Sequence, residues 1–512
     1  MEYFVIAGLA INLLVQAYYY MYMLQLNSYS YIKHANWIVK NFMKVVLRMI
    51  PPALAGIMFS IHNVYSEAAA VVLLLCSIAI YFPRGGSKVK FRLTGRVLRM
   101  FVTEFVIIAL LELLTFRFFA IGTLVILNLV ACVLCLLANV INIPIEKAGK
   151  AYYVSQAKKI INNMPDLIVI GVTGSYGKTS TKFFLEKILS KKYEVLATPK
   201  NYNTTLGVVK TIKEYLKPTH QIFICEMGAE RLGEIKEICD IVKPKYGIIT
   251  AIGPQHLETF KSLKNIIKTK FELADAVRDN GGKVFLNFDN EYIAKHDIKQ
   301  DFASYGINDK QLDFAGMEIV TSSRGSDFKI YDKADKKTVS YNTKLIGAHN
   351  VINIVGAVAA AKELGVSLDD AVRQVKQIES VEHRLQLTRK NGFNIIDDSY
   401  NSNPVSSKKA VDTLAQFDGV KILVTPGMIE LGKDERDYNY EFGKYAADYC
   451  DYVFLVNSRQ AEYIYDGLKS KKYDESKIYR VSSPTEAVDK ALKLGIKEEI
   501  TILLENDLPD NY

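Results

Sequence analysis

Long stretches without charge fill most of the first 143 residues, whereas polar and apolar positions mix in ordinary proportions afterwards. The apolar runs lie at 4–26, 46–64, 67–83, 100–119 and 121–142. A helix needs about 20 predominantly apolar residues to cross a hydrocarbon core about 30 Å thick. The pattern therefore predicts five membrane-spanning helices. Pro51 and Pro52 interrupt the second run, which we expect to be the weakest span, kinked or re-entrant.

Basic residues gather in two of the connections between these runs. One is 27–45, with Lys33, Lys40 and Lys44, and the other is 84–99, with Arg84, Lys88, Lys90, Arg92, Arg96 and Arg99. Because Lys and Arg favour the cytoplasmic side, we expect both connections and everything after residue 143 in the cytoplasm, with the N-terminus outside. No basic segment precedes the first run, so we expect an uncleaved anchor and not a signal peptide.

Two carboxylates, Glu104 and Glu112, interrupt the fourth run. A charged side chain within a membrane is costly and calls for a partner or a function. One interpretation is hydrogen bonding between helices or snorkelling, with Glu112 reaching Arg117. The other is contact with a bound headgroup.

Composition supports a chain built from two kinds of part. Its 512 residues suggest two or three domains, and it is 49% hydrophobic yet 23% charged. Much of the early positive charge behind the net +9 lies between apolar runs, so we expect a membrane and no nucleic acid as partner. The six cysteines show no disulfide or zinc spacing, and Cys132 and Cys135, inside an apolar run, are expected to pack.

A glycine-rich loop follows the first strand-like run of the polar part. Leu167–Val172 is apolar and β-branched, and it leads into the loop and then a helical stretch through Leu189. The loop reads Thr173, Gly174, Ser175, Tyr176, Gly177, Lys178, Thr179 and Ser180. Strand, glycine loop and helix N-terminus form a cradle for phosphates. We expect ATP here, with Lys178 on the terminal phosphates and Thr179 on Mg²⁺.

The general phosphate-loop pattern would need Gly at position 172, where this chain has Val. The TGxxGKTS spacing instead resembles the Mur ligases, which add amino acids to cell-wall precursors. Further segments resemble that family in the same order: Asn201–Val208, Ile224–Ala229, Gly253–Glu258 and Thr269–Glu272. The resemblance implies a magnesium site at Thr179, Glu226 and His256, joined by Lys270 if that lysine carries a carbamate. Glu226, at the end of an apolar strand, also suits magnesium as a hard oxygen ligand.

The second half of the chain continues the resemblance. Leu345–Asn353 is similar to the element whose asparagines, here Asn350 and Asn353, contact the adenine region; helix capping by Asn350 is the alternative. Glu382–Gln386 contains the hinge arginine, Arg384, implied to neutralise phosphate charge. Asp397–Pro404 is similar to a DDSYNANP motif in which Asp398 accepts hydrogen bonds from ribose. Together with Gly427–Gly432 it points to the branch that adds D-alanyl-D-alanine.

The chain also departs from the family pattern. The soluble domain that holds the UDP sugar in the family is replaced by the apolar N-terminal part. Thr204 stands where a second Asn is expected, Asn439 stands where a His is expected, and Leu504–Tyr512 replaces a KGSR-like segment. Each departure touches the acceptor or donor side. The reaction is therefore better defined by the sequence than the substrates are.

These observations predict a membrane α-helical domain (1–143), a basic, helical connector (144–165), a central P-loop α/β domain (166–378) and a C-terminal Rossmann-like α/β domain (379–512). We expect an ATP- and Mg²⁺-dependent ligase that joins an amino acid or dipeptide to a cell-wall carboxylate, lipid-linked or UDP-linked, through an acyl phosphate. The expected catalytic residues are Lys178, His256, Lys270 and Arg384. The alternatives are a membrane poly-γ-glutamate-type ligase, and a P-loop ATPase in transport or regulation.

Overall fold

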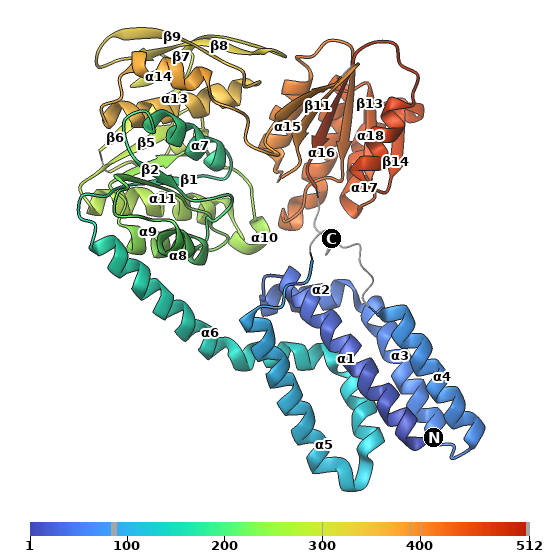
Figure 1. The fold of residues 1–512 in the computed structure, drawn as a ribbon. Coiled ribbons are helices and arrows are strands. Elements are labelled where there is room, and N and C mark those ends of the chain that lie inside the picture. The colour runs from blue at the N-terminus through green and yellow to red at the C-terminus, as the bar shows by residue number, and fades with distance from the viewer. Residues whose placement is uncertain (83–89, 300, 391, 401, 508–512) are drawn as a thin grey trace. The chain divides into compact units, whose positions relative to one another are not determined.

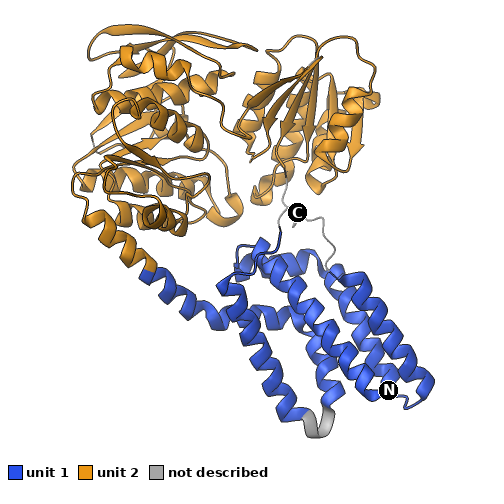
Figure 2. Cartoon of the chain, viewed as in Figure 1, with its two compact units in different colours: residues 1–152, 508–512 blue, residues 153–507 orange. Residues whose placement is uncertain are grey.

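The computed structural model describes residues 1–82, 90–299, 301–390, 392–400 and 402–507, without the side chains of 116–119. Two compact units make up the chain, one formed by Met1–Tyr152 and the other by Tyr153–Asp507 (Figure 2). Part of the predicted basic connection at 84–99, and the side chain of Arg117, lie outside the described residues.

The first unit is entirely helical in its described part (Figure 1). Its helices are α1 (Glu2–Leu26), α2 (Tyr31–Lys40), α3 (Phe42–Phe59), α4 (Val64–Tyr81), α5 (Gly95–Leu129) and the first part of α6 (Ala131–Asn162). Among the described residues, four helices are long and apolar enough to cross a membrane: α1, α3, α4 and α6. The first three match predicted spans. The fourth predicted span lies inside α5. The fifth, predicted at 121–142, is divided by the break at Val130 between the apolar end of α5 (Ala120–Leu129) and the start of α6.

Two helix boundaries differ from the sequence prediction. The chain stays helical through the expected connection at 119–121, and the break comes instead at Val130. The expected domain boundary at residue 143 falls inside α6, which continues past Pro144 to Asn162. A helix need not end where its residues change from apolar to polar, because its hydrogen bonds are internal to it. Likewise α3 is continuous through Pro51 and Pro52.

A network of amides occupies the centre of the helical unit. Asn12 Nδ2 donates to Ser77 Oγ (2.8 Å), and Gln16 Nε2 donates to Asn12 Oδ1 (3.0 Å) and to Asn128 Oδ1 (3.1 Å). These bonds join α1 to α4 and α5, as polar residues do between apolar helices. Glu104 is also buried, but its carboxylate has no hydrogen-bond partner among the described residues, so the interhelical hydrogen bond of the first interpretation is not formed at this residue.

The second unit holds two sheets, which define a middle lobe and a C-terminal lobe. The middle sheet has the order β2-β3-β1-β4-β5-β6-β7-β8-β9. Its parallel strands are β2 (Val195–Ala197), β3 (Ile222–Glu226), β1 (Ile168–Thr173), β4 (Tyr246–Ile249), β5 (Lys283–Asn287), β6 (Phe302–Ile307) and β7 (Phe314–Ser322). Two antiparallel strands follow, β8 (Gly325–Asp332) and β9 (Lys337–Thr343). The apolar runs that predict buried parallel strands therefore form the centre of this sheet.

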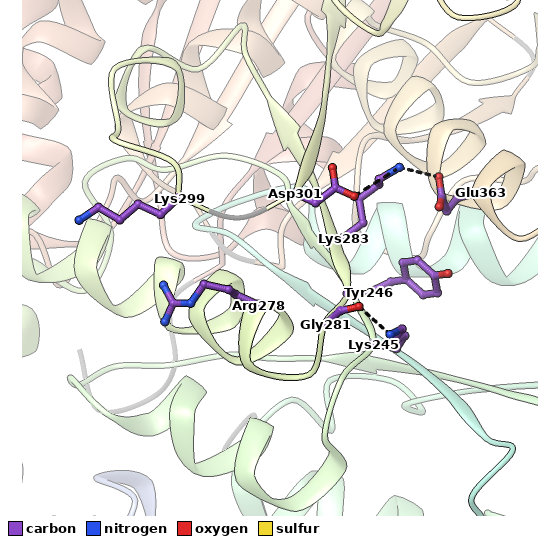
Figure 3. Close-up of a pocket in the computed structure, with 9 residues that line it drawn as sticks. Lys245, Tyr246, Arg278, Gly281, Lys283, Lys299, Asp301 and Glu363 are labelled. Carbon is purple, nitrogen blue, oxygen red and sulfur yellow. Dashed lines mark hydrogen bonds and ion pairs between the residues drawn. The ribbon is translucent and has the colours of Figure 1, made fainter.

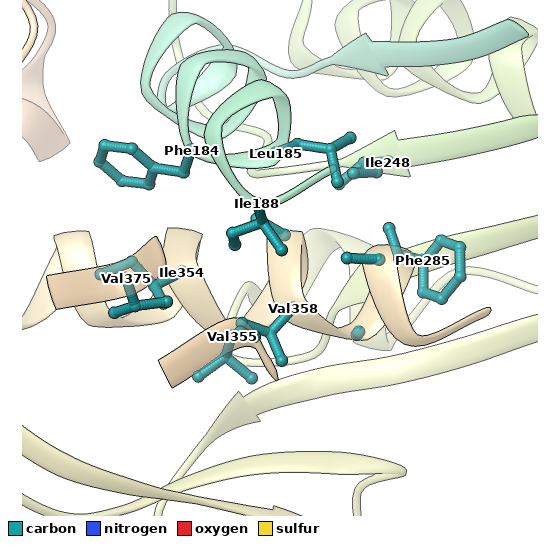
Figure 4. Packing of buried hydrophobic residues seen from close by; sticks show 14 of the residues in the cluster. Phe184, Leu185, Ile188, Ile248, Phe285, Ile354, Val355, Val358 and Val375 are labelled. Carbon is teal, nitrogen blue, oxygen red and sulfur yellow. The ribbon is translucent and has the colours of Figure 1, made fainter. Parts of the chain in front are cut away.

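The core on one face of this sheet joins the helix after the glycine loop to a helix far away in sequence (Figure 4). Phe184 and Ile188 of α7 (Lys178–Leu189) belong to the same buried cluster as Val355 and Val358 of α13 (Ala348–Glu363). Burying a side chain of this size contributes about 1.5–3 kcal/mol. Because the alanines of α13 have small side chains, this helix can pack closely against its neighbours. This packing fixes α13 beside the loop.

The C-terminal lobe confirms the predicted second parallel sheet, in the order β10-β11-β15-β12-β13-β14. The strands are β10 (Gln386–Lys390), β11 (Phe393–Asp398), β15 (Ile500–Glu505), β12 (Val420–Thr425), β13 (Tyr452–Val456) and β14 (Ile478–Val481), with only β10 antiparallel to its neighbour. Ligands bind outside the carboxyl ends of such strands. Asp398, Thr425 and Glu505 end three adjacent strands at that edge.

Candidate active site

The glycine loop connects β1 to α7 in a conformation that requires its glycines. Gly177 has φ 82°, and a Cβ there would lie 2.8 Å from Asn353 Oδ1. Gly174 has φ 154°, and its Cβ would lie 2.1 Å from Thr250 Oγ1. Ser175 N–H donates to Ala251 O (2.7 Å), and Ser175 Oγ donates to Gly253 O (3.0 Å). The loop is therefore held by the segment that follows β4.

Lys178, at the first turn of α7, is folded back on the loop. Its Nζ donates to Gly174 O (2.7 Å) and Ser175 O (3.2 Å). Burial lowers the pKa of Lys178 to about 8; Glu226 opposes this shift and Arg384 adds to it. Lys178 thus lies within electrostatic reach of both lobes. An ammonium group held here by two carbonyls is ready to exchange them for phosphate oxygens.

Glu226, the last residue of β3, is the centre of a polar cluster. Its Oε1 accepts from Thr179 Oγ1 (3.1 Å) and Asn203 Nδ2 (3.0 Å), and its Oε2 pairs with Lys182 Nζ (3.0 Å). Burial raises the pKa of Glu226, but Lys182 and Lys178 outweigh burial and leave that pKa below its usual value. The carboxylate is therefore ionised at neutral pH.

Lys182 is the residue of this cluster that sequence analysis missed. It also donates to Thr198 O and Lys200 O, each at 2.8 Å. Its spacing from Lys178 was the available signal, since residues four apart share one face of a helix. The sequence nevertheless does not show which side chain such a lysine pairs with, because that depends on the order of the strands in the sheet.

The residues at this position suit Mg²⁺. Thr179 and Glu226 lie together as the sequence predicts, and Mg²⁺ is usually held by one or two carboxylates plus substrate phosphates and waters. Among the described residues, no group of three or more His, Cys, Asp and Glu side chains forms a complete metal cage. The donor set therefore fits a metal that arrives with ATP.

His256 lies at the end of the segment after β4, where it precedes α10 (Leu257–Phe260) with φ 52°. Its Nδ1 contacts Glu430 Oε2, in the loop between β12 and the short helix η1 (Gly432–Asp434) of the C-terminal lobe. The sequence predicts His256 as a metal ligand but gives no sign of this carboxylate partner.

Lys270 is buried in α11 (Leu263–Asp279), with only 3% of its surface exposed. Burial lowers the pKa of Lys270 to about 7; Lys178 adds to the shift, and Glu234 and Glu272 oppose it. Near neutral pH a large fraction of this amine is uncharged. An uncharged amine is the form that reacts with CO₂ to give a carbamate.

This pKa predicts a pH dependence. Below about pH 7 Lys270 is protonated and cannot be carbamylated, so we expect metal-dependent activity to fall as pH decreases from 8 to 6. Added bicarbonate should raise activity at pH 7.5 and have little effect on Lys270→Met. Initial rates across this pH range, with and without bicarbonate, test the prediction. Equal bicarbonate responses of both proteins would contradict it.

The two predicted adenine-region asparagines lie three residues apart on α13 and have different contacts. Asn350 Nδ2 donates to Ile346 O (2.9 Å), and Gly347, not Asn350, is the N-cap of α13, so the capping alternative is wrong. Asn353 lies against Gly177 of the phosphate loop. The structure therefore connects at least Asn353 to the phosphate end of the predicted nucleotide site.

Arg384 and Asp398 come together in the C-terminal lobe. The Arg384 guanidinium lies over the Tyr400 ring (4.1 Å to its centre), and Asp398 Oδ1 accepts from Leu385 N–H (3.2 Å). Burial raises the pKa of Asp398 to about 7; Arg384 opposes the shift and Glu505 reinforces it. This carboxyl group can therefore accept or donate hydrogen bonds near neutral pH.

The family departures in this lobe have structural partners. Asn439 accepts from Met428 N–H (2.8 Å) and donates to Met428 O (2.9 Å), which fixes the loop after β12. Glu505 accepts hydrogen bonds from Ser407 (2.8 Å), Thr425 (2.6 Å) and Ser402. The sequence did not predict that Glu505, the last residue of β15, joins the end of β12 to the first turn of α15 (Pro404–Leu414) and to Ser402 before it.

A separate hollow of about 450 Å³ lies at the opposite edge of the middle sheet (Figure 3). Tyr246 and Lys283, which begin β4 and β5, line it. Lys283 is paired with Glu363 (3.1 Å), and Lys245 donates to Gly281 O (2.6 Å). The phosphate loop follows the carboxyl end of β1, so this hollow is not the nucleotide site.

Comparisons with known proteins agree with this arrangement. Residues 172–361 match the family model of the Mur ligase middle domain, and residues 383–505 match that of the Mur ligase, glutamate ligase domain. The UDP-N-acetylmuramoyl-tripeptide–D-alanyl-D-alanine ligase of Bacillus subtilis is 31% identical over 337 residues, which cover 64% of this chain and 70% of that protein. The Escherichia coli protein of the same name is 29% identical over 281 residues, 54% of this chain and 62% of its own.

Solved structures show the same similarity. The crystal structure of MurF from Acinetobacter baumannii has a TM-score of 0.63 and 27% identity, and the match covers 70% of this chain and 77% of that one. MurF from Thermotoga maritima, solved with ADP, has a TM-score of 0.62 at 24% identity and covers 70% and 80%. The second similarity concerns the fold.

Proposed function

The chain belongs to the Mur ligase family of ATP-dependent ligases, and on that basis we propose that it joins an amino acid or dipeptide to a carboxylate of a cell-wall precursor through an acyl phosphate. One observation carries the proposal. The phosphate loop, with Lys178 and Thr179 beside Glu226, lies within electrostatic reach of Arg384 of the other lobe. Phosphoryl transfer needs such a concentration of positive charge.

Several residues of the chain have distinct roles in the proposed reaction. Lys178 exchanges the carbonyls of Gly174 and Ser175 for the terminal phosphates, and Arg384 adds a second positive charge there. Thr179 and Glu226 would hold Mg²⁺, which supplies further charge neutralisation when bound. The acceptor carboxylate attacks the γ-phosphorus and ADP leaves. The amine then attacks the acyl carbon, inorganic phosphate leaves with the proton that the nitrogen loses, and the amide remains.

The amine we propose is D-alanyl-D-alanine or a related small amino acid or dipeptide. The relatives from Bacillus subtilis and Escherichia coli carry that dipeptide in their names. Asp398, which is half-buried, and Glu505, which is buried, end adjacent strands at the carboxyl edge of the C-terminal sheet, where ligands of such sheets bind.

We further propose that the helical unit embeds the enzyme in the cytoplasmic membrane, with the catalytic lobes inside, and presents a lipid-linked acceptor. Four apolar helices and the basic connection that includes Arg92, Arg96 and Arg99 support an embedded unit. The family matches begin only at residue 172, after this unit. A membrane anchor that serves a soluble, UDP-linked acceptor is the competing hypothesis.

Substrate competition tests this proposal. Membranes containing the full chain are incubated with ATP, labelled D-alanyl-D-alanine, and either a lipid-linked or a UDP-linked tripeptide precursor, and products are separated by thin-layer chromatography. We expect label in the lipid-linked product and none with Lys178→Ala. Label only in the UDP-linked product would refute the lipid acceptor. ATP hydrolysis that needs neither amine nor acceptor would refute the ligase itself.

A further inference from the structure

The contact between His256 and Glu430 crosses from the middle lobe to the C-terminal lobe. The two residues are 174 positions apart, and their side chains are 23% and 22% exposed. A second bond runs between the same segments, because Glu258 N–H donates to Glu430 O (3.3 Å). Gly432 approaches this junction closely, since a Cβ there would lie 3.7 Å from Glu258 N. The two segments therefore meet through backbone and side chain together.

The hydrogen bond between His256 and Glu430 determines which imidazole nitrogen is available to bind a metal. An ionised carboxylate can only accept hydrogen bonds, so ionised Glu430 pairs with the tautomer of His256 in which Nδ1–H donates to Oε2. The lone pair is then on Nε2. Histidines that bind metals commonly donate their other ring N–H to a carboxylate, which fixes both the tautomer and the orientation of the ring.

The segment that carries His256 is also fixed to the phosphate loop. Gly253 N–H donates to Ser175 Oγ (3.1 Å), and Ser175 N–H donates to Ala251 O (2.7 Å). His256 follows Gly253 by three residues. One side of this segment is thus held by the nucleotide-binding loop and the other by Glu430.

We propose that Glu430 is a positioning residue that holds His256 ready to bind the active-site metal, and that it does so only while the C-terminal lobe contacts the segment after β4. This inference rests on the proposed function, because it adds His256 as a ligand to the metal that Thr179 and Glu226 would hold beside the nucleotide. Docking of the C-terminal lobe would then complete the metal site. Metal binding would in turn favour docking, since such coupling is reciprocal.

Metal binding by the full-length protein in detergent tests the proposal without turnover. Mn²⁺ replaces Mg²⁺, ADP is present, and electron paramagnetic resonance measures free Mn²⁺ during titration. Electron spin-echo envelope modulation detects the coupling between bound Mn²⁺ and the ¹⁴N nucleus of an imidazole ligand. We expect Glu430→Ala to weaken Mn²⁺ binding about 10-fold and to diminish the ¹⁴N signal. Glu430→Gln keeps an oxygen acceptor for Nδ1–H and should stay within about threefold of wild type.

Two further variants separate the possible outcomes. Glu441→Ala removes an exposed glutamate of the same lobe that pairs with Lys444, and it should bind Mn²⁺ like wild type. His256→Ala should lose the ¹⁴N signal. If His256→Ala weakens Mn²⁺ binding but Glu430→Ala does not, the positioning role is refuted while the metal assignment stands. If His256→Ala changes nothing, His256 is not a ligand of this metal and the positioning role is refuted with it, while the metal site at Thr179 and Glu226 in the proposed function stands.

Discussion

Replacing Lys178 by Ala should reduce amide formation about 1,000-fold or more while the protein stays folded. The ammonium group of half-buried Lys178 donates to two carbonyls of the phosphate loop, and in the proposed reaction it neutralises charge that develops on the transferred phosphoryl group. Folding should change little, because the removed charge belongs to a half-buried side chain whose hydrogen-bond partners are two loop carbonyls. Phosphate release measured with saturating amine and acceptor gives the effect.

A second lysine on the same helix provides the control. Lys187 lies on α7, about two and a half helical turns after Lys178, and Lys187→Ala should keep wild-type activity. Circular dichroism and thermal unfolding should show the same fold for Lys178→Ala, Lys187→Ala and wild type. Substantial turnover by Lys178→Ala would mean that the phosphate loop does not carry the reaction.

Glu226→Gln should have the second large effect, on both stability and activity. The substitution keeps the shape but removes the negative charge that pairs with buried Lys182. Leaving one buried charge without its partner costs about 3–5 kcal/mol. Loss of the carboxylate should also weaken metal binding, and we expect turnover to fall about 100-fold or more. Denaturant unfolding and phosphate release measure the two effects separately.

A double variant tells these effects apart. Lys182→Met in the Glu226→Gln background removes the unpaired cation, so part of the lost stability should return. It cannot restore a metal-binding carboxylate, and activity should stay low. Recovery of turnover together with stability would show that Glu226 acts only through folding.

The paired Glu226 also predicts how stability depends on pH. Its pKa is lowered in the folded protein, so its stabilisation is fully present above the unfolded value of about 4.5 and is lost as pH falls through the folded value. Wild type should therefore lose more stability than Glu226→Gln when pH decreases from 5 towards 3. Parallel urea unfolding curves at these pH values provide the comparison.

Local sequence was sufficient for the phosphate loop and for both parallel sheets. Apolar β-branched runs such as Leu167–Val172 and Val420–Thr425 predict buried strands, and the glycine loop between strand and helix predicts a phosphate cradle. The pairing of Thr179 with Glu226 was also foreseeable, because the carboxyl ends of parallel strands share one edge of the sheet. These features depend on near neighbours in the chain and on a rule common to such sheets.

The ends of the helices in the first unit were harder to predict from the sequence. The apolar pattern locates the membrane-type runs, but α5 and α6 end where hydrogen bonding stops and not where hydrophobicity changes. The amides of Asn12, Gln16 and Asn128 read as isolated polar residues in the sequence. Only the packing of α1 against α4 and α5 turns them into one network.

By itself, the sequence determined the helices and strands, the nucleotide-binding loop and the class of reaction, because each of these depends on residues close together along the chain. The tertiary structure decided which distant side chains meet. Lys182 pairs with Glu226, Asn353 lies against Gly177, and Glu430 holds His256. These contacts follow from strand order and from the meeting of two lobes, and no local pattern of hydrophobic and polar residues specifies either of them.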